Sequence, residues 1–89
     1  MRHEKEELLK EELRLLAIHT RERLHLTQSV MAKSLSMSES SYSDIETGRT
    51  MCGSLTTILL LAMQEDPSDF LRVVKLKFLQ QYEKAMQLI

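Results

Sequence analysis

Residues 26–49 decide the fold, and they read LTQSVMAKSLSMSESSYSDIETGR. Thr27 and Ser38 each stand before a helical pattern, and their hydroxyl groups are favoured caps of helix N-termini. Gly48 stands where a helix ends on a residue in the left-handed conformation. The stretch therefore predicts two short helices joined by a tight turn, over residues 27–35 and 39–47.

The two short helices can share one small core. Ala32 stands where the helices must approach closely, because only a small side chain fits there. The apolar side chains expected to face inward are Val30, Met31, Leu35, Met37, Tyr42 and Ile45. This pattern is typical of a helix-turn-helix, here over residues 27–48, in which the second helix lies in the major groove of DNA.

The rest of the chain also predicts helices, so we expect an all-α fold of five helices in one domain over residues 1–89. An apolar stripe at three-, four- and seven-residue spacings predicts a long first helix from about residue 4 to residue 24. Ser54 is expected to cap a fourth helix. The residues expected to face the core from that helix are Leu55, Ile58, Leu59 and Ala62.

A long fifth helix is expected over residues 67–88. The sequence Asp66-Pro67-Ser68-Asp69 is a helix start, because it places a cap before a proline and an acidic residue in the first turn. One side of this helix is expected to cover the core, and its apolar residues are Leu71, Val74, Phe78, Tyr82, Ala85 and Ile89.

The fifth helix is too apolar for a helix that packs on one side only. A contiguous exposed apolar surface marks an interface, so we expect a two-fold homodimer through this helix. The expected interface residues are Phe70, Val73, Val74, Leu76, Phe78, Leu79 and Tyr82. The alternative is that the long first helix folds over this face within one chain.

Composition excludes several classes of protein. The 89 residues carry a net charge of -1 and are 43% hydrophobic and 28% charged, which is typical of a globular domain. Cys52 is the only cysteine, which excludes an intrachain disulfide and a cysteine zinc site. The longest apolar run spans only residues 58–63, too short to cross a membrane. The first residues carry charges of both signs with no apolar signal-peptide core after them, so we expect a cytoplasmic protein. No catalytic or metal-ligand pattern is present, so we expect a protein that is not an enzyme and needs no cofactor or metal.

The segment resembles the helix-turn-helix of the Cro/phage-repressor family, also called the xenobiotic-response-element family. The matching residues are Leu26, Thr27, Gln28, Met31, Ala32, Leu35, Met37, Ser38, Ser41, Tyr42, Ile45, Glu46, Gly48 and Arg49. The resemblance implies a five-helix lambda-repressor-like domain that binds double-stranded DNA, usually as a dimer. It also implies a transcriptional regulator, which we expect to act as a repressor.

Individual roles follow from the same resemblance. Gln28 matches a position that meets a phosphate, and Thr47 and Arg49 match phosphate contacts at the end of the recognition helix. Base contacts are implied for Glu39, Ser40 and Asp44, and Ser41 and Ser43 are expected on the same DNA face. Arg21 and Glu46 match a structural ion pair inside the domain, with Glu46 away from DNA.

The charge of the helix-turn-helix favours a second hypothesis. Between residues 19 and 53 the positive and negative side chains balance, and Glu39 and Asp44 are acidic where the family often carries Gln, Arg or Lys. Acidic side chains repel phosphates. The alternative is therefore an antitoxin or a protein-interaction scaffold with weak DNA binding, whose partner is another protein.

Overall fold

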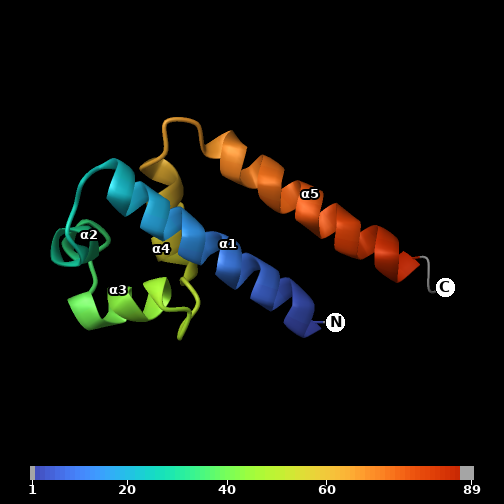
Figure 1. Ribbon diagram of the computed structural model, residues 1–89, viewed down its shortest axis with the longest axis horizontal. Helices are drawn as coiled ribbons and strands as arrows, with labels where there is room; N and C mark the ends of the chain where they lie inside the picture. Colours follow the sequence, from blue (N-terminus) through green and yellow to red (C-terminus); the bar gives the residue numbers. More distant parts are fainter. Residues whose placement is uncertain (1, 87–89) are drawn as a thin grey trace.

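The computed structural model describes residues 2–86 and the side chains of residues 5–84. The described residues form five helices and no strand, so the expected all-α fold is confirmed (Figure 1). The helices are α1 (Arg2–Arg23), α2 (Gln28–Ser34), α3 (Glu39–Glu46), α4 (Ser54–Ala62) and α5 (Pro67–Met86). Each begins and ends close to where the sequence predicts. Among these residues, no helix has the length and apolar character that crossing a membrane requires.

One core joins α1 to the three short helices. Its buried apolar members are Leu13, Ala17, Met31, Ala32, Leu35, Tyr42, Ile45, Cys52 and Leu60. The predicted core positions of the helix-turn-helix are confirmed except at Val30, which is 45% exposed. The helix has only two turns, and the side that carries Met31 and Leu35 faces the core. Val30 precedes Met31 by one residue, so its side chain points in a different direction.

The connections follow the local chemistry of the sequence. Thr27 accepts a hydrogen bond from the amide of Val30 at 3.2 Å, and Ser38 accepts one from the amide of Ser41 at 3.1 Å. Gly48 has a φ of 78°, as expected for the end of α3. Ser36 also adopts a positive φ, of 57°, which the sequence did not predict. These caps and turns fix the angle at which α3 leaves α2.

The inward face of α4 differs from the prediction. Leu55 and Ile58 are 68% and 63% exposed, and Ala62 is exposed as well. Leu59 is half-buried, and Thr56 and Leu60 are buried instead. The cap also differs, because Gly53 is the N-cap residue and makes no side-chain hydrogen bond there. No charged residue marks the solvent side of this helix, so the spacing of its apolar residues leaves its rotation undetermined.

The helix α5 lies antiparallel to α1, and α1 separates it from α3 (Figure 1). Phe70 packs against the core, and Val74 and Gln81 are half-buried. Lys77 donates a hydrogen bond to the buried carboxylate of Glu12 on α1.

The predicted inward stripe of α5 was therefore wrong at three positions, because Leu71, Phe78 and Tyr82 are exposed. Its last two members, Ala85 and Ile89, lie outside the residues whose side chains are described. The physical reason is the buried Glu12, which needs a positive partner. The contact between Lys77 and Glu12 sets which side of α5 faces α1. Residues on one side of a helix recur at three- and four-residue spacings, so the whole helix is rotated relative to the prediction.

Candidate nucleic-acid interface

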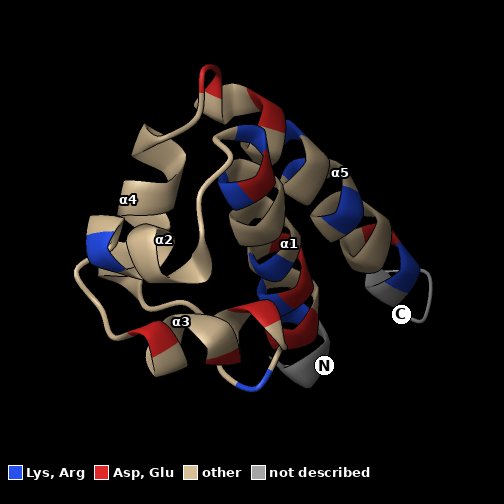
Figure 2. Ribbon diagram, turned by 60° about the vertical axis from the view of Figure 1, so that its left-hand side comes forward, with Lys and Arg blue, Asp and Glu red and all other residues tan. Residues whose placement is uncertain are grey.

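One side of α3 is buried and the other is open to solvent. Tyr42, Ile45 and Glu46 are buried against the rest of the domain. The opposite side carries Ser40, Ser43, Asp44 and Thr47. Glu39 lies seven residues before Glu46, on the same side of the helix but at its exposed N-terminal end. Of the DNA-face residues expected from the sequence, Glu39, Ser40, Ser41, Thr47 and Arg49 are exposed, and Ser43 and Asp44 are half-buried. Figure 2 shows α3 at an outer edge of the molecule, where a large partner can reach it.

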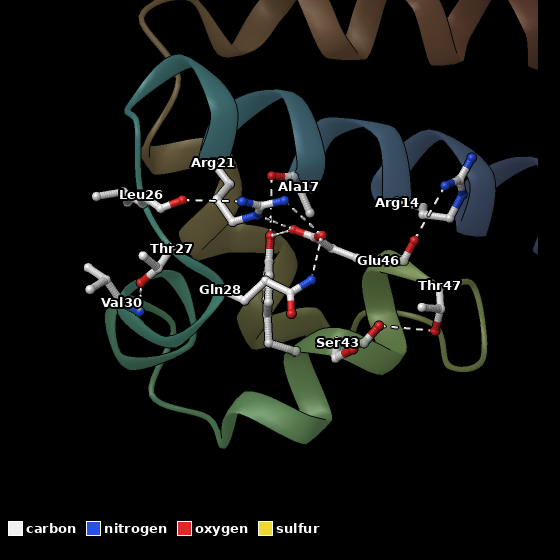
Figure 3. Close-up of polar contacts among 11 residues, drawn as sticks. Arg14, Ala17, Arg21, Leu26, Thr27, Gln28, Val30, Ser43, Glu46 and Thr47 are labelled. Atoms are coloured by element: carbon white, nitrogen blue, oxygen red, sulfur yellow. Dashed lines mark hydrogen bonds and ion pairs between the residues drawn. The ribbon is translucent and has the colours of Figure 1, made fainter.

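An ion pair between α1 and α3 anchors the buried side. The Arg21 guanidinium donates two hydrogen bonds to the Glu46 carboxylate, with Nε to Oε2 at 2.6 Å and Nη2 to Oε1 at 3.2 Å (Figure 3). The side chain of Glu46 is 7% exposed and that of Arg21 is 23% exposed. The expected pair thus lies together, and a two-bond contact of this kind fixes orientation as well as distance.

Three further groups converge on Glu46. The Tyr42 hydroxyl donates to Oε2 and also lies 3.4 Å from the backbone oxygen of Ala17. The Gln28 amide donates to Oε1 at 3.0 Å. The guanidinium of Arg14 donates to the backbone oxygen of Glu46 at 3.3 Å. Glu46 is the last residue of α3, so this bond also holds the end of that helix. Figure 3 shows these groups around the end of α3, and together they join α1, α2 and α3.

The sequence alone did not indicate two of these contacts. Tyr42 was assigned to the core for its ring, and the bond from its hydroxyl to Glu46 follows from a spacing of four residues on one helix face. Arg14 precedes Arg21 by seven residues, which places both on one side of α1. That spacing was the available signal for Arg14.

The contacts at this cluster shift the pKa values of its members. Burial alone would raise the pKa of Glu46, but the hydrogen bonds from Arg21, Tyr42 and Gln28 outweigh it and hold that pKa below its usual range. Burial, and then the bond to Glu46, raise the pKa of the Tyr42 hydroxyl. The hydrogen bond to Glu46 raises the pKa of Arg21. At neutral pH the Arg21–Glu46 pair therefore holds one positive and one negative charge.

Gln28 lies at the edge of this anchor. Its side chain is half-buried, and its amide group is engaged by Glu46 rather than free at the surface. A phosphate contact from this residue would therefore have to come from its backbone or require a new side-chain position.

The exposed side of α3 contains both engaged and free side chains. Thr47 donates from its hydroxyl to the backbone oxygen of Ser43 at 3.0 Å. Asp44 lies 3.9 Å from Arg49, measured from Oδ1 to Nη1, in a loose and exposed ion pair. Ser41 is part of the cap of α3. Within the described residues, the side chains without a polar partner on this face are Glu39, Ser40 and Ser43.

The charge of this face is balanced. Glu39 and Asp44 oppose Lys33 at the end of α2 and Arg49 just after α3. In Figure 2 α3 itself carries acidic residues and no basic ones. Attraction to phosphates is consequently modest, so recognition would depend on specific contacts more than on net charge.

The residues expected at a dimer interface divide into two groups. Phe70 and Val74 are half-buried within the chain, next to α1. The exposed members are Val73, Leu76, Phe78, Leu79 and Tyr82. The alternative in which the first helix covers this face holds only in part. Lys5 of α1 lies over the ring of Phe78, 5.4 Å from its centroid, but α1 leaves Val73, Leu76 and Tyr82 exposed.

A metal site is not apparent where the chain is described. Within those residues no group of three His, Cys, Asp or Glu side chains is arranged to hold a metal ion. The thiol of Cys52 is buried, and burial raises its pKa, which keeps it protonated.

A comparison with known protein families matches residues 12–63 to the family described as helix-turn-helix domain. The match includes α2, α3, α4 and the C-terminal half of α1, and it covers more than half of the chain. No curated protein and no solved structure matches the chain. Residues 12–63 contain the anchored pair of short helices described above, and the chain therefore belongs to the helix-turn-helix domain family.

Proposed function

We propose that this protein is a sequence-specific transcriptional regulator, acting as a repressor, that inserts α3 into the major groove of DNA. The observation that carries the proposal is that the free side chains of Glu39, at the start of α3, and of Ser40 and Ser43, on its outer side, stand on a helix fixed by the Arg21–Glu46 pair. The major groove is wide enough to admit one helix, and base edges there present distinct donors and acceptors. Within the helix-turn-helix family, we assign the chain to the Cro/phage-repressor type.

The anchor supports a role in reading bases. Base recognition requires side chains held in one orientation, because a hydrogen bond weakens steeply with misalignment. Glu46 ties the end of α3 to α1 and α2, so the helix cannot rotate without breaking several hydrogen bonds. The remaining outer contacts, from Thr47 and Arg49, suit phosphates on either side of the groove.

We further propose that the protein binds DNA as a homodimer through α5. Leu76 is 59% exposed, and Val73 and Leu79 recur at three-residue spacing beside it. The whole of α5 lies outside the residues that match the family, and α1 separates it from α3, so a second copy on α5 would leave α3 accessible. A two-fold dimer would present two α3 helices about 34 Å apart, which is one turn of DNA.

Selection of bound duplexes from a random pool tests the proposed function. We expect enrichment of a palindromic motif whose half-sites are centred about 10 base pairs apart. A variant with Glu39, Ser40 and Ser43 all changed to Ala should lose the enrichment. The matched control changes Arg72, Lys75 and Lys84 of α5 to Ala, which removes three positive charges away from α3 and should preserve the motif. An unenriched pool, or equal loss in both variants, would contradict the proposal.

A second candidate function is favoured by the balanced charge of the α3 face and by α4. Leu55 and Ile58 are the most exposed large apolar side chains of the described residues, on a helix without any charge. An antitoxin or scaffold would use such a surface to bind another protein. In that case the selection would enrich nothing, and changing Ile58 to Asp would release a co-purifying protein.

A further inference from the structure

We propose that Glu39 selects a cytosine in each half-site, and so determines much of the DNA sequence preference. This inference rests on the proposed function, since it names the base class that α3 reads. Glu39 is the first residue of α3, directly after the cap residue Ser38. Recognition helices contact base edges chiefly through their N-terminal residues.

The structure distinguishes Glu39 from the other acidic residues of α3. Glu46 is buried and engaged by Arg21, Tyr42 and Gln28. Asp44 has Arg49 as a nearby positive partner, with 3.9 Å between Oδ1 and Nη1. Glu39 is exposed and has no polar partner within the described residues. It is therefore the one acid of the described α3 that is free to accept a hydrogen bond from DNA.

The chemistry of a carboxylate restricts which base can donate a hydrogen bond to it. An ionised carboxylate only accepts hydrogen bonds. In the major groove guanine presents only acceptors, thymine presents an acceptor and a methyl group, and adenine pairs its amino donor with a neighbouring acceptor. Cytosine presents its amino group as a donor, so it is the base that suits Glu39 best.

The same charge disfavours DNA that lacks the right base. A carboxylate in the groove loses its hydration, and without a donor nothing replaces it. It is also repelled by the phosphates that line the groove. The positive charges of Lys33 and Arg49 are balanced by the negative charges of Glu39 and Asp44, so no net positive charge on this part of the protein offsets the repulsion. Glu39 thus weakens binding to unrelated DNA and raises the ratio of specific to non-specific affinity.

Changing Glu39 to Gln separates the two effects. Glutamine has nearly the same shape and is uncharged, and its amide suits the paired donor and acceptor of adenine. We expect selection with the Glu39→Gln protein to replace one cytosine per half-site by adenine, with a preference changed by roughly 10- to 100-fold. Affinity for a random-sequence duplex should rise several-fold, because one negative charge is removed.

Two further variants control this experiment. Asp44→Asn removes a charge from the same helix, and we expect it to keep the cytosine. Glu39→Ala should leave that position without a preferred base. All three variants change side chains outside the core, and circular dichroism checks that each is folded.

The outcomes of this experiment are distinct. A motif that keeps the same bases in the wild type and in Glu39→Gln overturns the role of Glu39 and leaves the proposed function intact. A wild-type selection that enriches no motif overturns both. A cytosine lost in Asp44→Asn but retained in Glu39→Gln would also overturn the inference, because it would assign the contact to Asp44.

Discussion

The Nε atom of Arg21 lies 2.6 Å from Oε2 of Glu46, and this contact fastens the C-terminal end of α3 to α1. Glu46 also accepts from Tyr42 and Gln28, so one carboxylate satisfies donors from three helices. The pair thereby determines how α3 projects from the domain. Its loss is expected to affect both stability and recognition.

Changing Glu46 to Ala should lower the free energy of unfolding by about 2–3 kcal/mol. The value is below that of a fully buried pair because Arg21 remains 23% exposed and can reach water when its partner is lost. Urea denaturation measures the effect. Glu39→Ala is the matched control, since it removes an exposed and unpaired carboxylate from the same helix and should change stability little. Equal losses in the two variants would show that the pair stabilises nothing.

The stability of the domain should depend on Glu46 as the pH falls. Because the pKa of Glu46 is lower in the folded protein than its unfolded value of about 4.3, its contribution is complete above about pH 5. The contribution of Glu46 is lost as the pH falls from the pKa of the unfolded protein toward the lower pKa of the folded protein. The difference in unfolding free energy between the wild type and Glu46→Gln should therefore shrink below about pH 5. A difference that stays constant from neutral pH to about pH 3 would refute this linkage.

Changing Arg49 to Ala should weaken binding to every DNA sequence by a similar factor. Its guanidinium is largely exposed and only loosely paired with Asp44, so it is available to a phosphate. The slope of log affinity against log salt concentration should become shallower by about 0.9 for the lost contact. Lys75→Ala on α5 is the control and should leave the slope unchanged. A loss confined to certain sequences would instead indicate that Arg49 contacts a base.

Light scattering at micromolar concentration tests the proposed dimer. We expect a dimer mass for the wild type and a monomer mass for Leu76→Asp or Leu79→Asp, because a charge at a buried interface has no partner. Ile58→Asp on α4 is the control of similar exposure and should remain a dimer. A wild-type monomer refutes the dimer, and a monomer produced by Ile58→Asp alone would assign the interface to α4.

The sequence predicted the features that depend on local chemistry. The caps at Thr27 and Ser38, the left-handed Gly48 and the start of α5 at Pro67 each follow from one residue and its neighbours. The five helices were predictable for the same reason. The pairing of Arg21 with Glu46 required the resemblance to a family, because residues so far apart in sequence give no local signal.

The rotation of two helices could not be predicted. α4 contains no charged residue, so nothing in its sequence distinguishes Leu55 from Leu60 as the buried position. α5 was predicted to bury its apolar residues, but Lys77 faces inward to neutralise Glu12 of α1. The hydrogen bond from Gln28 to Glu46 could not be predicted for a similar reason, since it joins residues on two helices and depends on tertiary packing, as the contact between Lys77 and Glu12 does.

Chemical-shift mapping measures most directly whether α3 is the part of the protein that binds DNA. An isotope-labelled sample is titrated with the duplex that the selection enriches most, and backbone amide signals are followed. We expect the largest shifts from residues 39–50, with signals of α4 nearly unchanged. Shifts concentrated on α4 or α5 with residues 39–50 unaffected would contradict DNA reading by α3, as would an absence of shifts at stoichiometric duplex.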